Sequence, residues 1–297
     1  MTATKFTAPP SVTHTETPKP KRARKVTRPK PAGDATFAVL HDRRIAYTEH
    51  LGTGPVYLLV HGIGGNQTDW ARVTERLVET GQHVITVDLP GHGLSAKDRG
   101  DYSLGAMASV LRDLLEYLGH RQAILVGHSL GGGVAMQFTY QFPERCSGLV
   151  LVCSGGLGTE TPKWLRAATL PGSRIVFAAI GSEKTTNSLL WGCRQLARVG
   201  IEPQLVNPQM VEKLSEFGDS DTREAFLATL RSVVDVSGQR VTALGKLASM
   251  EDLPVLLIWG ARDPVLPLHH GERAAEAGVD VVECARNGRR PPVLQEC

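Results

Sequence analysis

A serine flanked by glycines, at a switch from a strand pattern to a helix pattern, constrains this chain of 297 residues more than any other feature. The short apolar run Gln122 to Val126 predicts a buried strand, and the segment from Leu130 to Phe142 predicts a helix that Pro143 ends. Between them stands Gly127-His128-Ser129-Leu130-Gly131-Gly132, which has the pattern Gly-x-Ser-x-Gly. Because side chains at the first and last glycine would collide on a sharp turn, the motif predicts Ser129 as a nucleophile pushed outward.

A glycine-rich turn before a helix is also the form of a phosphate-binding loop. A P-loop needs Gly-Lys-Ser/Thr, and a dinucleotide fingerprint needs GxGxxG with an acidic residue about 20 residues later. This segment has neither. The nucleophile is therefore the favoured interpretation of the motif.

From residue 35 the chain alternates short apolar runs with longer amphipathic segments. We predict strands at Thr36 to Leu40, Arg43 to Thr48, Val56 to Val60, His83 to Asp88, Gln122 to Val126, Gly148 to Val152, Val255 to Trp259 and Val279 to Glu283. We predict helices from Thr68 or Asp69 to Thr80, from Ser103 to Leu118, from Leu130 to Phe142 and from Pro267 to Ala277. This alternation predicts an α/β fold with a mostly parallel central sheet and helices on both faces.

Residues 155–252 break the alternation. Apolar residues recur there at helical spacing and strand-like runs are absent, with helices predicted at Leu189 to Val199, Met210 to Phe217 and Arg223 to Val234. We therefore predict a helical cap over 155–252, inserted into a core formed by 34–154 and 253–297.

Residues 1–33 form a basic, proline-rich tail that we expect to be disordered. They carry eight Lys or Arg against one Glu, and prolines together with like charges oppose both helix and core formation. Electrostatic contact with nucleic acid or an anionic membrane is open to such a tail. No aromatic residues stand between its charges to stack on bases, so we predict no specific nucleic-acid binding.

The remaining composition indicates a soluble cytoplasmic protein. No stretch approaches the roughly 18 apolar residues of a membrane span, and the N-terminus lacks the apolar core of a secretory signal. The cysteines are scattered without a CxxC pair, which fits a reduced compartment and no structural zinc: Cys146, Cys153, Cys193, Cys284 and Cys297.

A second glycine-rich motif, His61-Gly62-Ile63-Gly64-Gly65, directly follows the strand Val56 to Val60. Acyl transfer develops negative charge on an oxygen, which two preorganised N–H groups stabilise. We assign the N–H groups of Ile63 and Leu130 to this oxyanion hole. A tight turn without function is the alternative for this motif alone, but its position before the serine motif favours the functional role.

These motifs together resemble the α/β-hydrolase superfamily over about residues 35–283. The resemblance rests on HGIGG, DLPGHGLS (Asp88 to Ser95), GHSLGGGVAMQF and WGARDPVLP (Trp259 to Pro267), and is closest to capped bacterial esterase- or lipase-like members. It implies Asp263 as the acid that orients the catalytic histidine. Serine at position 129 argues against haloalkane dehalogenases and epoxide hydrolases, which carry aspartate there.

The resemblance also implies roles for the residues beside the serine. His61, Gly62 and His128 are expected to contact the substrate. His61 and His92 recur in such sequences as turn and pocket-lining residues. His128 is expected to point away from the Ser129 side chain. None of these three histidines is therefore taken as the base.

The histidine that the family implies is missing from its expected place. It belongs to a Gly-His-x-Pro loop after the last strand, followed by a helix, but Val281 to Cys297 contains no histidine. His269 and His270 lie on the predicted helix leading away from the site and are poor candidates for a base. Our hypothesis is a shifted reading frame or altered terminus after Glu283, with an exposed apolar patch near Val279 to Val282 and irregular chain beyond.

The sequence therefore predicts a serine hydrolase of ester-type small molecules (carboxylesters, thioesters or lactones) that works through an acyl-enzyme on Ser129 and is impaired by the missing base. No cofactor or metal is needed. A non-catalytic small-molecule binder on the same scaffold is the alternative. Substrate identity and oligomeric state are left open, although an apolar acyl group is favoured if the cap side chains line the pocket instead of forming the cap's own core: Trp164, Leu165, Leu189, Leu190, Trp191 and Phe226.

Overall fold

The computed structural model describes residues 35–198, 208–247, 253–276 and 280–284. The predicted tail of residues 1–33 and the irregular chain predicted after residue 284 lie outside the described residues, as do the side chains of the predicted apolar patch near Val282.

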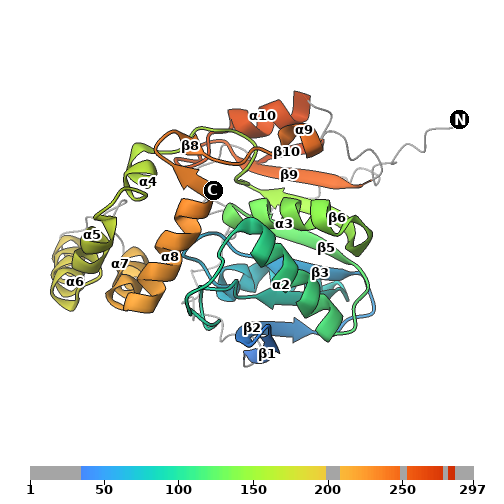
Figure 1. The fold of residues 1–297 in the computed structure, drawn as a ribbon, viewed down its shortest axis with the longest axis horizontal. Coiled ribbons are helices and arrows are strands. Elements are labelled where there is room, and N and C mark those ends of the chain that lie inside the picture. Colours follow the sequence, from blue (N-terminus) through green and yellow to red (C-terminus); the bar gives the residue numbers. More distant parts are fainter. Residues whose placement is uncertain (1–34, 199–207, 248–252, 277–279, 285–297) are drawn as a thin grey trace, which may run out of the picture. The chain divides into compact units, whose positions relative to one another are not determined.

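A single eight-stranded sheet forms the centre of the described chain, in the order β1-β2-β4-β3-β5-β6-β9-β10 (Figure 1). Its strands are β1 (Thr36–Leu40), β2 (Arg43–His50), β3 (Val56–Val60), β4 (His83–Val87), β5 (Ala123–His128), β6 (Cys146–Val152), β9 (Val255–Gly260) and β10 (Asp280–Cys284). The pairs β1·β2 and β2·β4 are antiparallel, and every other pair is parallel. The predicted α/β fold with a mostly parallel sheet is confirmed.

The helices that connect parallel strands cover both faces of this sheet. They are α1 (Ala71–Glu79), α2 (Leu104–Tyr117), α3 (Leu130–Gln141) and α10 (His269–Glu276). Crossovers between parallel strands are right-handed, and the steps β3-α1-β4 and β5-α3-β6 run in opposite directions across the sheet. Helix α1 therefore lies on the face opposite α3, while α2 packs against α3 (Figure 1).

Local sequence explains most of these boundaries. All five residues of β4 are buried, as expected for an apolar run without alternation. The Ser103 side chain accepts from the Ala106 N–H at 3.3 Å and begins α2 as predicted. The predicted cap at Thr68 or Asp69 is wrong: Asn66 caps a 3₁₀ turn, η1 (Gln67–Trp70), and α1 follows it.

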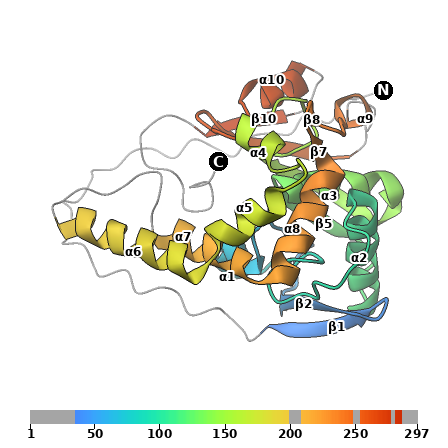
Figure 2. The same ribbon diagram turned by 60° about the vertical axis from the view of Figure 1, so that its left-hand side comes forward.

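The segment between β6 and β9 is mainly helical. It contains α4 (Lys163–Ala167), α5 (Ser173–Ile180), α6 (Glu183–Arg198), α7 (Pro208–Ser215), α8 (Ser220–Val233) and α9 (Leu244–Leu247), of which α5 to α8 lie together (Figure 2). The segment also contains a short 3₁₀ turn, η3 (Glu216–Gly218). Another 3₁₀ turn, η2 (Pro143–Arg145), lies before β6. Within the described residues, none of the helices combines the length and apolarity needed to cross a membrane.

The expectation that this segment holds no strand is wrong. Strands β7 (Val234–Asp235) and β8 (Gly238–Gln239) pair as a small hairpin directly after α8. Two-residue strands are too short to show a periodicity, and Gly238, with a φ of 133°, gives the only local signal of the turn.

Candidate active site

Ser129 lies on the turn between β5 and α3, in a backbone conformation that side chains rarely adopt. Its φ is 52° and its ψ is −114°, a strained region that costs on the order of 1–3 kcal/mol. The Ser129 N–H donates to the Val152 carbonyl at 3.1 Å, and the Gly155 N–H donates to the Ser129 carbonyl at 3.0 Å. The end of β6 and the chain after it thus hold the strained serine in place, with its side chain half-buried.

Three glycines allow the backbone to pack this tightly around the serine. A Cβ atom on Gly127 would lie 2.3 Å from the Gly131 carbonyl oxygen, and one on Gly131 would lie 2.2 Å from the Val60 carbonyl oxygen. A Cβ atom on Gly132 would meet the Ser154 hydroxyl at 2.1 Å. The glycines of the motif are therefore required by close approach of α3 to β3, β5 and the chain after β6.

The second glycine-rich motif lies directly beside the serine. A Cβ atom built on Gly62 would stand 3.2 Å from the Ser129 Cβ and 3.0 Å from Nδ1 of His128. Leu130 is the first residue of α3, so its N–H has no partner within the helix. Among the hydrogen bonds of the described residues, none uses the N–H of Ile63 or of Leu130. Both donors are thus available close to Ser129.

The His61 ring is held by the backbone on both sides, and its predicted contact with substrate stays a prediction. The ring is fully buried. Its Nε2 accepts from the Leu89 N–H at 3.0 Å, so Nδ1 carries the proton and donates to the Gly62 carbonyl at 2.7 Å. Burial is the main cause that lowers the pKa of His61 to about 4. With both nitrogens bonded to backbone, the ring joins two turns; the predicted roles of Gly62 and His128 remain predictions.

Acid is expected to destabilise the fold through His61 and a second buried histidine, His92. The pKa of His92 is lowered to about 3, mainly by burial, and its Nε2 has no partner within the described structure. Both folded pKa values lie below the unfolded value near 6.5, so the unfolded chain takes up the protons. Stability is complete above about pH 6.5 and falls towards pH 4, by up to ~1.4 kcal/mol per pH unit for each histidine.

Urea unfolding at several pH values measures this dependence. His92→Gln should reduce the slope of unfolding free energy against pH by about one histidine's share. A slope that is unchanged by His92→Gln would show that His92 does not stay neutral in the folded protein.

Asp263 lies in the turn after β9, at the same edge of the sheet as Ser129, because β5 and β9 both run parallel to β6 between them. Its Oδ1 accepts from the N–H groups of Val265 at 2.7 Å and Leu266 at 2.8 Å. These two bonds fix the orientation of the carboxylate. The turn therefore holds Asp263 rigidly, as a residue that orients another group must be.

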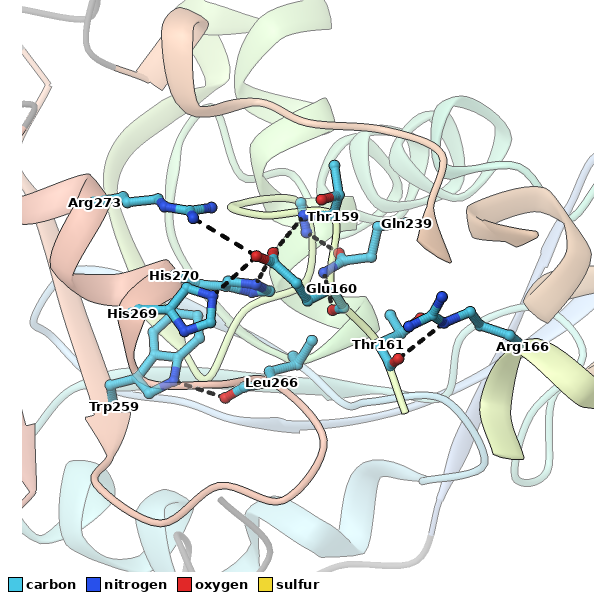
Figure 3. A network of polar contacts seen from close by, with 11 residues as sticks. Thr159, Glu160, Thr161, Arg166, Gln239, Trp259, Leu266, His269, His270 and Arg273 are labelled. Atoms are coloured by element: carbon cyan, nitrogen blue, oxygen red, sulfur yellow. Dashed lines mark hydrogen bonds and ion pairs between the residues drawn. The ribbon is translucent and has the colours of Figure 1, made fainter. Parts of the chain in front are cut away.

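The histidines nearest Asp263 in the sequence bond to a different carboxylate. Nε2 of His270 lies 2.7 Å from Glu160, and Nε2 of His269 lies 3.2 Å from its other oxygen (Figure 3). Arg273 approaches the same carboxylate at 3.6 Å. Hydrogen bonds lower the pKa of Glu160 to about 2. The largest contribution comes from the backbone N–H of Glu160 itself, and the next from the His270 side chain. These contacts tie α10 to the chain that follows β6, so both imidazole rings are engaged with Glu160.

Three phenylalanines of the helical segment between β6 and β9 form an aromatic cluster beside the site. Phe177, Phe217 and Phe226 have ring centroids 4.8–5.4 Å apart. Ile63, from the glycine-rich turn, and Val265, from the Asp263 turn, pack against this cluster. Of these three, only Phe226 was among the lining residues expected from the sequence, although the phenylalanines of α5 and η3 were a visible signal for the other two.

The other predicted lining residues divide into two groups. Leu165 belongs to the same apolar cluster as Phe226. Trp164 and Trp191 are 60% and 65% exposed, so neither belongs to that buried cluster. Helical spacing alone does not distinguish exposed from buried positions on α4 and α6, and Leu189 and Leu190 are half-buried.

Two sets of side chains in the described part of the chain have the composition of a metal site, which the sequence had not indicated. They are Glu49, His83 and His120, and Glu160, His269 and His270. The members of the first set are far apart in the sequence, so no spacing motif could reveal it.

Comparison with known proteins identifies the family that this fold and serine turn define. The family model described as alpha/beta hydrolase fold matches residues 55–287, and the chain belongs to that family. An uncharacterized protein of Mycobacterium tuberculosis is 39% identical over 243 residues, which are 81% of this chain and 71% of that protein. Lipase 3 of a Moraxella species is 28% identical over 217 residues, covering 72% of this chain and 64% of the lipase.

Solved structures agree on the fold. A probable hydrolytic enzyme from Pseudomonas aeruginosa superposes with a TM-score of 0.65 at 21% identity, covering 90% of this chain and 91% of that one. At this identity the likeness concerns the fold alone.

Proposed function

We propose that this protein is a serine hydrolase of ester-type small molecules that works through an acyl-enzyme on Ser129. The observation that carries the proposal is the strained turn of Ser129, beside which the N–H groups of Ile63 and Leu130 are without hydrogen bonds in the described structure. A nucleophile next to two preorganised donors is the arrangement that acyl transfer needs.

In the proposed reaction the Ser129 hydroxyl oxygen attacks the carbonyl carbon of the ester. The carbonyl oxygen becomes an oxyanion and accepts hydrogen bonds from Ile63 and Leu130. Collapse of this intermediate breaks the bond to the leaving oxygen, or to the sulfur of a thioester. The leaving group departs as the alcohol or thiol with the proton that the Ser129 hydroxyl gives up, and the acyl group stays on Ser129. Water then releases the acid, so the reaction requires no cofactor.

The substrate class follows from what adjoins these groups. Ile63 and Val265 pack against the phenylalanine cluster of the cap segment, which favours an apolar acyl group. The similarity to a Moraxella lipase supports ester chemistry. Carboxylesters, thioesters and lactones share the same attacked carbonyl and remain within the proposal.

The proposed mechanism lacks an evident general base. His61 and His92 are buried and neutral, and His269 and His270 bond to Glu160. No histidine follows β10 in the sequence. Because a serine hydroxyl without a base is a weak nucleophile, we propose that this chain turns over slowly. The same observation favours a small-molecule binder as the second candidate function.

Hydrolysis of p-nitrophenyl butyrate by the purified chain tests the proposal. We expect slow turnover that falls to the buffer rate in Ser129→Ala, and labelling by a fluorophosphonate probe at Ser129 located by mass spectrometry. Ser109→Ala serves as the matched control, because the Ser109 hydroxyl donates to the Gly105 carbonyl within α2. This variant should leave the turnover and the labelling unchanged.

The two candidate functions give different results in this assay. Turnover that persists in Ser129→Ala would refute the acyl-enzyme on Ser129. A rise in melting temperature with the non-hydrolysable ketone analogue of the ester, without any Ser129-dependent turnover, would support the binder.

A further inference from the structure

We propose that Glu49, His83 and His120 form a binding site for a divalent transition metal, with Zn²⁺ as the ion that their ligand chemistry fits best. The site lies outside the proposed active site and does not depend on the proposed function. Imidazole nitrogens and a carboxylate oxygen are ordinary zinc ligands, and three protein ligands with an open fourth position make a common set.

The three side chains converge on a single point. Nε2 of His83 lies 2.8 Å and Nε2 of His120 lies 3.0 Å from the same oxygen, Oε1 of Glu49. The two imidazole rings stand edge to face with centroids 4.5 Å apart. Ligand atoms around a tetrahedral zinc ion are about 3.3 Å apart, given bonds of about 2.0–2.1 Å. The ligand atoms of the three side chains all lie within 4.8 Å of one another, so small adjustments of the side chains are needed to admit the ion.

Rigid elements place each of the three ligands. Glu49 of β2 pairs with Ile85 of β4, so His83, two residues before Ile85, is a diagonal neighbour on the same face of the sheet. His120 follows α2, whose end is fixed by Gly119 with a φ of 79° and by the His120 N–H bond to the Leu115 carbonyl at 2.8 Å. The site is therefore already assembled before an ion arrives.

The second His-Glu cluster, around Glu160, lacks these properties. His269 and His270 approach different oxygens of that carboxylate, and the Arg273 guanidinium already lies 3.6 Å from it. The cluster of Glu49 is the better metal site of the two.

The site lies away from Ser129, at the points where strands enter the sheet. His83 is the first residue of β4, and His120 precedes β5, so both lie at the edge of the sheet opposite Ser129. The ion would join β2, β4 and the chain entering β5. Side-chain exposures of 9% for His83, 18% for His120 and 22% for Glu49 leave solvent access for the ion and for a fourth, water ligand.

Metal titration of the full-length, untagged chain tests the proposal. After chelator treatment, isothermal titration with ZnCl₂ should give one equivalent bound at this site and a rise in melting temperature. His83→Gln and His120→Gln should each weaken binding at least about tenfold and remove most of the rise. His269→Gln is the matched control in the other cluster and should change neither.

His120→Gln lies after a helix end and is expected to fold even if His83→Gln, at a buried position, does not. Co²⁺ absorption typical of tetrahedral nitrogen and oxygen ligands should appear in the parent chain and in His269→Gln, and be lost in His120→Gln. Zinc binding that survives His120→Gln, binding that His269→Gln removes, or no binding to the parent chain would each overturn the proposal.

Discussion

Substituting Arg289 with histidine is expected to raise Ser129-dependent ester hydrolysis by about 10³-fold or more. The chain after β10 reads Gly288-Arg289-Arg290-Pro291, so glycine and proline already occupy the first and last positions of Gly-His-x-Pro. Arg289 stands where the histidine belongs. A single substitution, Arg289→His, therefore completes the motif that the resemblance to α/β-hydrolases implies.

The size of the effect follows from what the base does. In serine proteases, removal of the histidine alone costs about 10⁶ in kcat, because nothing takes the proton of the attacking hydroxyl. Asp263, whose Oδ1 is held by two backbone N–H groups, would orient the new imidazole. We expect the gain in kcat/KM for p-nitrophenyl butyrate to be partial, since the residues around position 289 were not selected to hold a histidine.

Three further variants make this prediction specific. Arg290→His moves the imidazole one position along the chain and should give little gain. Combining Arg289→His with Ser129→Ala should remove the gain entirely, and combining it with Asp263→Asn should remove most of it. If Arg289→His folds with an unchanged melting temperature and an unchanged rate, the missing base is not what limits this chain.

Replacing Gly131 by alanine is expected to destabilise the protein by about 3 kcal/mol or more. The new Cβ would lie 2.2 Å from the Val60 carbonyl oxygen and 2.6 Å from that of His61. Both are backbone atoms of the central sheet and the turn after it, so no side-chain rotation can relieve the collision. The first turn of α3 must move away from β3, and the Ser129 turn must move with it.

Gly133→Ala is the matched control, two residues further along α3. Its Cβ would meet the side chain of Leu104 at 3.6 Å, an ordinary contact, and alanine is favoured over glycine in a helix by about 1 kcal/mol. Urea unfolding should therefore show a large loss for Gly131→Ala and none for Gly133→Ala. Equal midpoints for the two variants would mean that α3 does not approach β3 as closely as described.

The sequence alone predicted the parts of this protein that depend on local pattern. Apolar runs without alternation predicted the parallel strands, because both faces of such strands are covered. The spacing of glycines around Ser129 predicted a sharp strand-to-helix turn, since backbone contacts there exclude a Cβ atom. The absence of a histidine after Glu283 is likewise readable without a structure.

Tertiary structure decided which residues face one another across the fold. The sequence context of His61 does not show that its ring is fully buried and bonded to Leu89 and Gly62, which the tertiary structure shows. Trp164 fits a helical pattern equally well inside or outside, and it lies outside. The convergence of His83 and His120 on Glu49 has no local signal, because strand pairing and a helix end bring together residues up to 71 positions apart.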